Sequence, residues 1–498
     1  MEELTIYQVI ENFIQLGVEN GTIQELDVTY LRNQLLHFIG IDDWQIPKEK
    51  KLETDSLLLM DRLLAYAQEK GKSVEEEKEA YEAALMDFIT PAPSKINMDF
   101  WEKYQHSPDK ATDYFYTLAK QVNQVKTRDI ARNILFKHQT KYGELEITIN
   151  LSKPEKDPKA IAAEKERKIQ SISYPLCQLC MENEGFFGGN GQAARSNHRI
   201  VRLKLGDEEW GLQYSPYAYY NEHSIVLNEK HQPMKINQKT FVNLFSFLEQ
   251  FPHYMIGSNA DLPIVGGSIL THDHYQAGRH DFPMAKTDIR EKVKLKDFPE
   301  MSAGILNWPM SVLRLTSARK EELIEASQMI LEKWKIYDDK DLNILSQTSD
   351  GVVHHTITPI AYKHGESYEI NLVLRDNNVS DEFPDGIFHP HPELHHIKKE
   401  NIGLIEVMGL AILPPRLKEE LKEVEKYLIN ESNEMKAIHQ RWVNELKSKD
   451  NFTPENVEKK VREAVGEVFS QVLQDAGVFK DNQKGQDGFR RFIAFLNK

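Results

Sequence analysis

The sequence predicts an α+β fold in which a largely antiparallel sheet lies between helical N-terminal and C-terminal regions. Apolar residues recur at helical spacing in the first 140 residues, where glycine and proline are scarce. From Tyr174 to about Met408, short β-branched runs alternate with turns, and histidine becomes frequent. Helical spacing then returns. We therefore expect four parts, with the boundaries 1–140, 141–300, 301–412 and 413–498.

The N-terminal part is expected to be a packed set of helices. Two apolar stripes follow the helical period: Ile6, Val9, Ile10, Phe13 and Leu16, and then Leu57, Met60, Leu63, Leu64 and Ala67. Gly40, Gly71 and residues 90–93 break the pattern. These residues contain no chemical motif, so we interpret this part as structural.

The middle of the chain supplies the predicted strands. These are residues 144–151, 200–205, 210–214, 224–227, 312–315, 352–360 and 367–374. Residues 241–251 carry helical spacing, and residues 363–366 suit a hairpin turn between the last two strands. We find no convincing internal repeat.

The tail is predicted to be helical. Leu417, Leu421, Val424 and Leu428 form one apolar stripe after two prolines. A second stripe begins after Thr453, which can cap a helix whose first residue is Pro454.

The composition argues against several classes of protein. Among 498 residues, 77 are acidic and 62 are basic, which gives a net charge of −15. Nonspecific nucleic-acid binding relies on basic surface, so we expect no nucleic-acid partner. No apolar run is long enough to span a membrane, and the acidic start does not resemble a secretory signal. We expect a cytoplasmic protein without membrane contact. The only two cysteines, Cys177 and Cys180, exclude a disulfide framework.

The strongest local signal is the run Gly266-Gly267-Ser268-Ile269-Leu270-Thr271-His272-Asp273-His274-Tyr275-Gln276. Because residues two apart in a strand share a face, His272, His274 and Gln276 would point the same way. The two glycines leave room for an anion to reach backbone N–H groups, and Ser268 adds a hydroxyl donor. The pattern indicates a phosphate beside an imidazole.

Two roles are open for His274. A neutral imidazole can attack phosphorus if an acceptor holds its other ring nitrogen. It could instead act as a general base towards water. Gln276 could donate to a phosphoryl oxygen in either case. The spacing of these residues does not separate the two roles.

The second signal is Cys177-Gln178-Leu179-Cys180. Two thiolates at this spacing can bind one Zn²⁺. Since no second C-x-x-C is present, the remaining ligands would be histidines, for which His223 and His272 are candidates. A dithiol redox pair is the alternative.

Other histidines and glycines give weaker signals. The run from His389 to His396 holds four histidines and one glutamate, but its two prolines favour a loop without ligands. His354 and His355 face opposite sides of a strand, and we interpret them as structural. Residues 188–191 are glycine-rich but lack the strand-then-helix context of a dinucleotide-binding loop.

With these motifs, the sequence resembles the galactose-1-phosphate uridylyltransferases of the second type, found in Gram-positive bacteria and related to the histidine-triad superfamily. The resemblance covers essentially the whole chain. The segments that carry it are Cys177-x-x-Cys180, Tyr219-Tyr220-Asn221-Glu222-His223, Gly257-Ser258-Asn259-Ala260-Asp261 and His272-Asp273-His274-Tyr275-Gln276. It implies a histidine-triad-like sheet, with residues 141–300 as the nucleotidyl-transfer domain and residues 301–412 as the acceptor side.

The resemblance also implies a double displacement with UDP-glucose and galactose 1-phosphate as substrates. His274 would attack the α-phosphorus, glucose 1-phosphate would leave, and galactose 1-phosphate would then accept the uridylyl group. Gln276, Ser268 and Asn259 match residues that contact phosphate and nucleotide, next to Gly266 and Gly267. The family's structural zinc ligands match the set Cys177, Cys180, His223 and His272. The family further implies a homodimer.

Two other functions stay open. One is a nucleotide hydrolase or phosphorylase of the histidine-triad superfamily, and the other is a zinc-stabilised nucleotide-binding module without activity. Gln276 argues against plain hydrolysis, because related hydrolases commonly have a histidine there that can protonate a leaving group. A binding module gives no reason for the glycines and Ser268 to precede the paired histidines.

Overall fold

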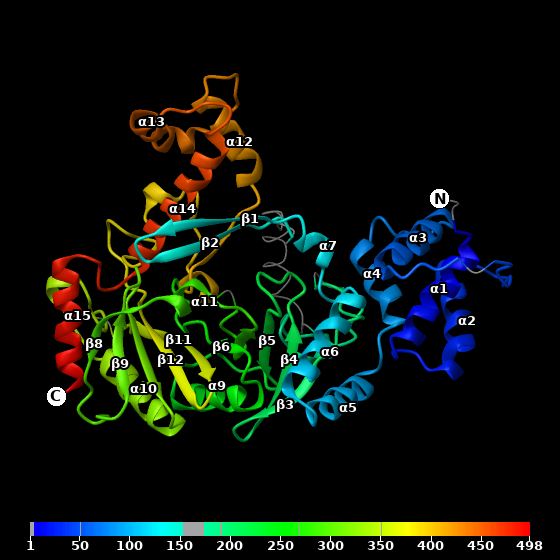
Figure 1. Ribbon diagram of the computed structural model, residues 1–498, viewed down its shortest axis with the longest axis horizontal. Helices are drawn as coiled ribbons and strands as arrows, with labels where there is room; N and C mark the ends of the chain where they lie inside the picture. The colour runs from blue at the N-terminus through cyan, green and yellow to red at the C-terminus, as the bar shows by residue number, and fades with distance from the viewer. Residues whose placement is uncertain (1–3, 50, 153–173, 190–191, 268, 350) are drawn as a thin grey trace.

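A computed structural model describes residues 4–49, 51–152, 174–189, 192–267, 269–349 and 351–498. Figure 1 shows a lobe of helices at the N-terminal end, a large central sheet, and a smaller sheet with helices above it. The chain therefore has the predicted α+β architecture with helical ends. Among the described residues, no helix is both long and apolar enough to cross a membrane.

Helices fill the N-terminal part up to residue 130. They are α1 (Ile6–Glu19), α2 (Val28–Ile39), α3 (Ser56–Glu69), α4 (Lys78–Asp87), α5 (Pro93–Tyr104), α6 (Pro108–Gln121) and α7 (Thr127–Ile130). Thr5 begins α1 with a capping box, in which its hydroxyl accepts from the Gln8 N–H and the Gln8 side chain accepts from the Thr5 N–H. The helical prediction extends too far, because residues 134–140 form a strand.

The central sheet has ten strands, and all neighbours in it are antiparallel. Its order is β3-β4-β5-β7-β6-β11-β12-β10-β9-β8. The strands are β3 (Val201–Leu205), β4 (Glu208–Tyr214), β5 (Ser224–Asn228), β6 (Met255–Gly257), β7 (His274–Gly278), β8 (Ile289–Val293), β9 (Ser302–Leu306), β10 (Val312–Ser317), β11 (His355–His364) and β12 (Ser367–Asp376). The prediction of a largely antiparallel sheet is confirmed.

The sheet consists of two halves with the same topology. From each outer edge inwards, the first, second, third, fifth and fourth strands of that half follow one another, and the halves meet where β6 pairs with β11. Each half inserts one helix between its third and fourth strands, namely α9 (Gln238–Gln250) and α10 (Lys320–Trp334). The fold thus contains a structural repeat that the sequence does not show.

The two faces of the sheet are covered differently. Helices α9 and α10 lie along one face (Figure 1), where Tyr275 and Leu372 belong to the larger hydrophobic core. The opposite face adjoins a second core, to which Val373 and Leu404 belong. His274 and Gln276 alternate with Tyr275 along β7, so they point to this second face.

A smaller sheet and most of the C-terminal helices stand over the second face (Figure 1), whereas the last helix, α15 (Gln483–Leu496), packs against α10 as part of the larger core. Strand β2 (Gly143–Ile149) lies between β1 (Ile134–Thr140), which is antiparallel to it, and β13 (Leu410–Leu413), which is parallel. The helices are α11 (Leu404–Val407), α12 (Leu417–Leu428), α13 (Gln440–Lys449), α14 (Val457–Ala476) and α15 (Gln483–Leu496). Pairing of β13 with β2 brings residues 400–406 back over the central sheet.

Short 3-10 helices occur at Glu25–Asp27, Met181–Asn183, Pro283–Lys286, Lys340–Leu342, Pro392–Leu394 and Ala437–His439.

A buried carboxylate holds the C-terminal helices together. Glu420 accepts hydrogen bonds from Arg416 at 2.5 Å, Lys436 at 2.8 Å and His439 at 2.9 Å. Burial alone would raise the pKa of Glu420, but these donors lower it to about 2.

We expect Glu420→Gln to lower the free energy of unfolding at pH 7 by about 1–3 kcal/mol, because charged hydrogen bonds are lost. The stabilisation from a lowered pKa is complete above the unfolded pKa of about 4.3 and is lost as the pH falls towards the folded pKa. The difference in unfolding free energy between the variant and wild type should therefore vanish between about pH 4.5 and pH 2. Urea unfolding over this pH range measures it. A difference that is independent of pH would contradict the assignment to the charge.

Candidate active site

A cavity of about 700 Å³ opens on the second face of the central sheet. His274 and Gln276 of β7 line it, together with Gly266 and Gly267 from the preceding loop and Asn259. Residues 400–406 lie along another wall. The structure therefore brings together all the predicted catalytic and substrate-binding residues that it describes. Ser268, also predicted to bind substrate, lies outside the described residues.

The ring of His274 is held in one orientation. Its Nδ1 lies 2.8 Å from the backbone oxygen of His272, so Nδ1 carries the proton and donates it. Nε2 is then the nitrogen with the free lone pair, and it has no hydrogen-bond partner among the described residues. Burial lowers the pKa of His274 to about 4, which keeps the ring neutral at pH 7. A neutral, oriented imidazole facing a cavity is suited to nucleophilic attack.

The amide of Gln276 is oriented by His223. The Nδ1 of His223 lies 3.5 Å from the Tyr219 N–H, which places the proton on Nε2. That nitrogen lies 3.0 Å from Oε1 of Gln276 and donates to it. The NH₂ group of Gln276 is therefore left to donate to a ligand in the cavity.

Asn259 and the glycines form the adjoining wall. Oδ1 of Asn259 accepts the Leu404 N–H at 2.9 Å, so the Asn259 amide NH₂ is turned away from that contact. A Cβ on Gly267 would lie 2.7 Å from Nδ2 of Asn259, and a Cβ on Gly266 would lie 2.6 Å from two backbone oxygens. Only glycine fits at these two positions. The wall offers amide donors without side chains to obstruct a phosphate.

Beside the cavity, Cys177, Cys180, His231 and His272 form a group that could hold a metal ion. Nδ1 of His272 lies 3.3 Å from the Cys177 sulfur, Nδ1 of His231 lies 3.2 Å from the Cys180 sulfur, and the sulfurs are 3.6 Å apart. A tetrahedral Zn²⁺ with ordinary bond lengths needs donor atoms about 3.3–3.8 Å apart, so the four residues fit it. Nε2 of His272 donates to the Asn228 oxygen at 2.8 Å, which leaves Nδ1 free to bind a metal.

The structure corrects the predicted ligand set at one position. His223 lies in contact with Gln276 instead of the thiols, and His231 takes its place in the group. Both histidines flank β5, but His223 immediately precedes it and lines the cavity, whereas His231 follows its other end. The C-x-x-C signal applied equally to both, and only the fold shows which end of β5 lies beside the thiols.

His272 also departs from the expectation that it shares a face with His274 and Gln276. The strand begins only at His274, and His272 in the preceding irregular segment turns its ring towards the thiols. Its backbone oxygen nevertheless holds His274. His272 of the candidate metal-binding group and His274 of the cavity are thus two residues apart in the chain and joined by a hydrogen bond.

The histidines in the run from His389 to His396 form hydrogen bonds within a loop. His389 contacts the Asn401 amide at 3.1 Å, whereas His391, His395 and His396 each contact a backbone oxygen. Within the described part of the chain, no second group of metal-ligating side chains forms. The run lies in a loop with one 3-10 turn, Pro392–Leu394, as expected.

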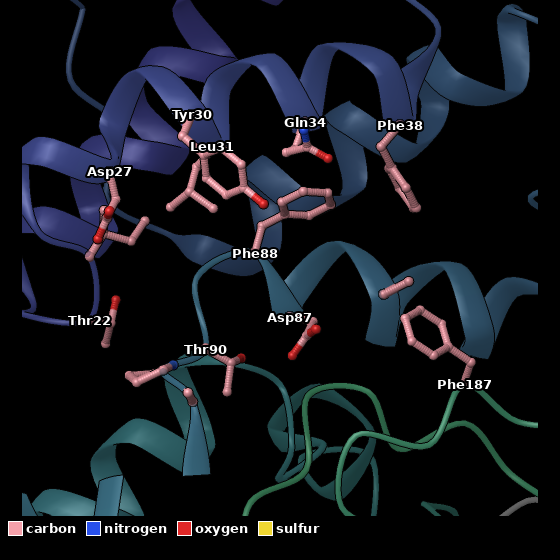
Figure 2. Close-up of a pocket in the computed structure, with 14 residues that line it drawn as sticks. Thr22, Asp27, Tyr30, Leu31, Gln34, Phe38, Asp87, Phe88, Thr90 and Phe187 are labelled. Carbon is pink, nitrogen blue, oxygen red and sulfur yellow. The ribbon is translucent and has the colours of Figure 1, made fainter. Parts of the chain in front are cut away.

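A second cavity, of about 520 Å³, lies between α2 and the end of α4, with Phe187 on one side (Figure 2). Phe88 and Tyr30 contribute aromatic rings, and Asp27 and Asp87 contribute carboxylates. The described residues that line it include no histidine or cysteine. We assign the chemistry to the cavity that contains His274.

Comparison with known proteins identifies the family. The family model "Galactose-1-phosphate uridyl transferase, N-terminal domain" matches residues 21–233, and the model of the C-terminal domain matches residues 247–444. The galactose-1-phosphate uridylyltransferase of Lactococcus lactis subsp. lactis is 65% identical over 99% of this chain and 100% of that protein. The corresponding protein of Enterococcus faecalis is 54% identical, over 97% of each.

Among solved structures, yeast Ap4A phosphorylase with bound Ap4A is 10% identical, with a TM-score of 0.37 over 72% of this chain and 93% of that chain. The family models and the full-length relatives agree with the motifs around His274. The chain belongs to the galactose-1-phosphate uridylyltransferase family.

Proposed function

We propose that this protein transfers a uridylyl group from UDP-glucose to galactose 1-phosphate through a covalent intermediate on His274. The observation that carries the proposal is the unpartnered Nε2 of a neutral, oriented imidazole in a cavity of nucleotide-sugar size. The names of the full-length relatives support the substrates.

The surrounding groups suit two similar displacements. In the first, Nε2 bonds to the α-phosphorus while the bond to the bridging oxygen breaks, and glucose 1-phosphate leaves. In the second, a phosphate oxygen of galactose 1-phosphate attacks the same phosphorus, and Nε2 leaves with its electron pair. The Gln276 NH₂ can donate to a non-bridging oxygen in both steps. Since a sugar phosphate needs no proton to leave at neutral pH, an amide serves here better than an acid.

The intermediate gives the direct test. The protein is incubated with UDP-glucose alone, and its intact mass is recorded. We expect an acid-labile adduct of one uridylyl group, which galactose 1-phosphate removes. An unmodified protein that still exchanges the two sugars would exclude the covalent route, and release of free UMP alone would favour a hydrolase.

We further propose that the group of Cys177, Cys180, His231 and His272 binds a structural zinc ion. Four protein ligands leave no open position, so the ion would serve to fix the segment of His272 and, through its backbone oxygen, the ring of His274. The homodimer that the family resemblance implies stays a prediction.

His223 is a positioning residue in this proposal, and its replacement should separate binding from chemistry. We expect His223→Ala to lower kcat about 10-fold with little change in KM, because the Gln276 amide is then free to rotate. His223→Gln keeps an N–H donor and should recover part of the loss. Steady-state kinetics measure both. A loss shared equally by the two variants, or confined to KM, would contradict the positioning role.

A further inference from the structure

The wall of the active-site cavity beyond β5 contains two polar side chains that the proposed mechanism does not use. His198 is only 3% exposed and lines the cavity, yet neither of its ring nitrogens has a hydrogen-bond partner among the described residues. Arg195 also lines the cavity, and its guanidinium makes one hydrogen bond, to the Ala194 oxygen at 3.2 Å. Unsatisfied polar groups facing a cavity indicate that a ligand completes them.

A neighbouring arginine shows what a purely structural role looks like in this segment. Arg199 donates to the backbone oxygens of Pro91, Ser196 and His198 and forms an ion pair with Asp87 at 2.6 Å. Arg195 forms no ion pair within the described residues, and burial lowers its pKa, which Tyr217 and Glu79 nearby only partly offset. Its backbone is nevertheless fixed, because its N–H donates to Phe186 and its oxygen accepts from His198.

The register of the sheet gives the order of groups along the cavity floor. Gln213 of β4 lies opposite Ile225 of β5, which lies opposite Gln276 of β7, so all three share one face. Two strand spacings, about 10 Å, separate Gln213 from the phosphorus position at Gln276. That separation leaves room for a ribose between the α-phosphate and a base lying over β4.

The side chains at the two ends of the cavity agree with this placement of the base over β4. The end over β4 and β5 offers Pro216 and Tyr217, which follow β4, and Ile225 of β5; these apolar or aromatic surfaces suit a planar base. The other end offers Glu400, Asn401 and Glu406, whose oxygens suit the hydroxyls of a hexose. The nucleoside therefore belongs at the end that contains Arg195 and His198.

We propose that Arg195 and His198 read the edge of uracil and make the enzyme selective for uridine over cytidine nucleotides. Arginine can only donate, and it would pair with O4 of uracil; a neutral histidine can accept from the N3–H. Cytosine carries an amino donor in place of the O4 acceptor and has no proton on N3, so both contacts would fail. The inference rests on the proposed function for the identity of the nucleotide.

Binding of UMP and CMP to the full chain, measured by calorimetry, tests this without turnover. Wild type should bind UMP more tightly. Arg195→Met should weaken UMP about 10- to 100-fold and leave CMP within about 3-fold, since a charged hydrogen bond to the base is lost. His198→Phe should reduce the same preference, and Arg195→Gln, which keeps a donor, should retain part of it. Arg441→Met, at an exposed arginine of α13, is the control that should change neither affinity.

Two outcomes would overturn the inference. One is a wild type that binds UMP and CMP equally. The other is an Arg195→Met variant that melts like wild type but loses both nucleotides by the same factor, which would assign Arg195 to the phosphate. Because UMP binding needs no reaction, a missing adduct on His274 would contradict the proposed function and leave this preference to be judged separately.

Discussion

His274→Ala should lose at least about 10⁴-fold in exchange between UDP-glucose and galactose 1-phosphate, because removal of a covalent nucleophile costs this much or more. The ring lies in the cavity, and the one hydrogen bond that it makes within the described part of the chain runs from Nδ1 to the His272 oxygen. The other nearby imidazoles are placed differently: His223 is bonded to Gln276, His272 is turned to the thiols, and His198 lies on the wall beyond β5, away from Gln276. Chromatography of the two nucleotide sugars measures the loss.

The control for this variant is His364→Ala, at the end of β11, where the side chain is 60% exposed. It should exchange the sugars at the wild-type rate. His274→Ala should also melt within a few degrees of wild type, since the ring makes a single hydrogen bond to the fold. A well-folded His274→Ala protein that still forms a uridylyl adduct would place the nucleophile elsewhere.

The sequence was sufficient to predict that His274 and Gln276 share one face, because the two residues are close together in the chain. His274 and Gln276 alternate on one strand, so the period of two predicts their common face without any tertiary information. The same reasoning failed for His272, because it assumes that the strand has already begun. Where the strand begins depends on pairing of β7 with β5 and β6, which are distant in the sequence.

The choice between His223 and His231 also required tertiary structure. Both are near β5, and ligand spacing allows either. Only the fold brings the irregular segment before β7 beside the residues that follow β5 and thus places His231, with His272, at the thiols. Arg195 and His198 carried no signal, because no motif surrounds them and their role depends on a cavity that several segments build.

The two halves of the central sheet have the same topology but different residues, which is why no internal repeat was visible in the sequence. Asn371 of β12 lies in the same row of the sheet as Gln276, and Glu369 lies two residues before it, as His274 does before Gln276. In the second half these positions form a closed network: Arg314 pairs with Glu369 at 3.1 Å and donates to Asn371 at 2.9 Å. The two halves share a topology, but the residues at corresponding positions differ, so the repeat leaves no pattern in the sequence.

Replacement of a thiol ligand should have the largest effect on stability. We expect Cys180→Ser to lose about one zinc ion per chain and to lower the free energy of unfolding by about 3 kcal/mol or more, because the ion joins segments around residues 177, 231 and 272. Exchange activity should fall as well, because His272 carries the acceptor for His274 Nδ1. Metal analysis of freshly purified protein and thermal melting measure the two effects.

A matched pair of histidine variants decides between the predicted and the observed ligand set. His231→Ala should lose zinc and melt at a lower temperature, because its Nδ1 lies 3.2 Å from the Cys180 sulfur. His223→Ala should keep the full zinc content and lose activity only, because its ring contacts Gln276 and none of the ligands. If His223→Ala releases the metal and His231→Ala retains it, the assignment to His231 is wrong. If wild type itself binds no zinc and both variants melt like it, the group is a set of free thiols and imidazoles, and the orientation of His274 must come from the β7 segment alone.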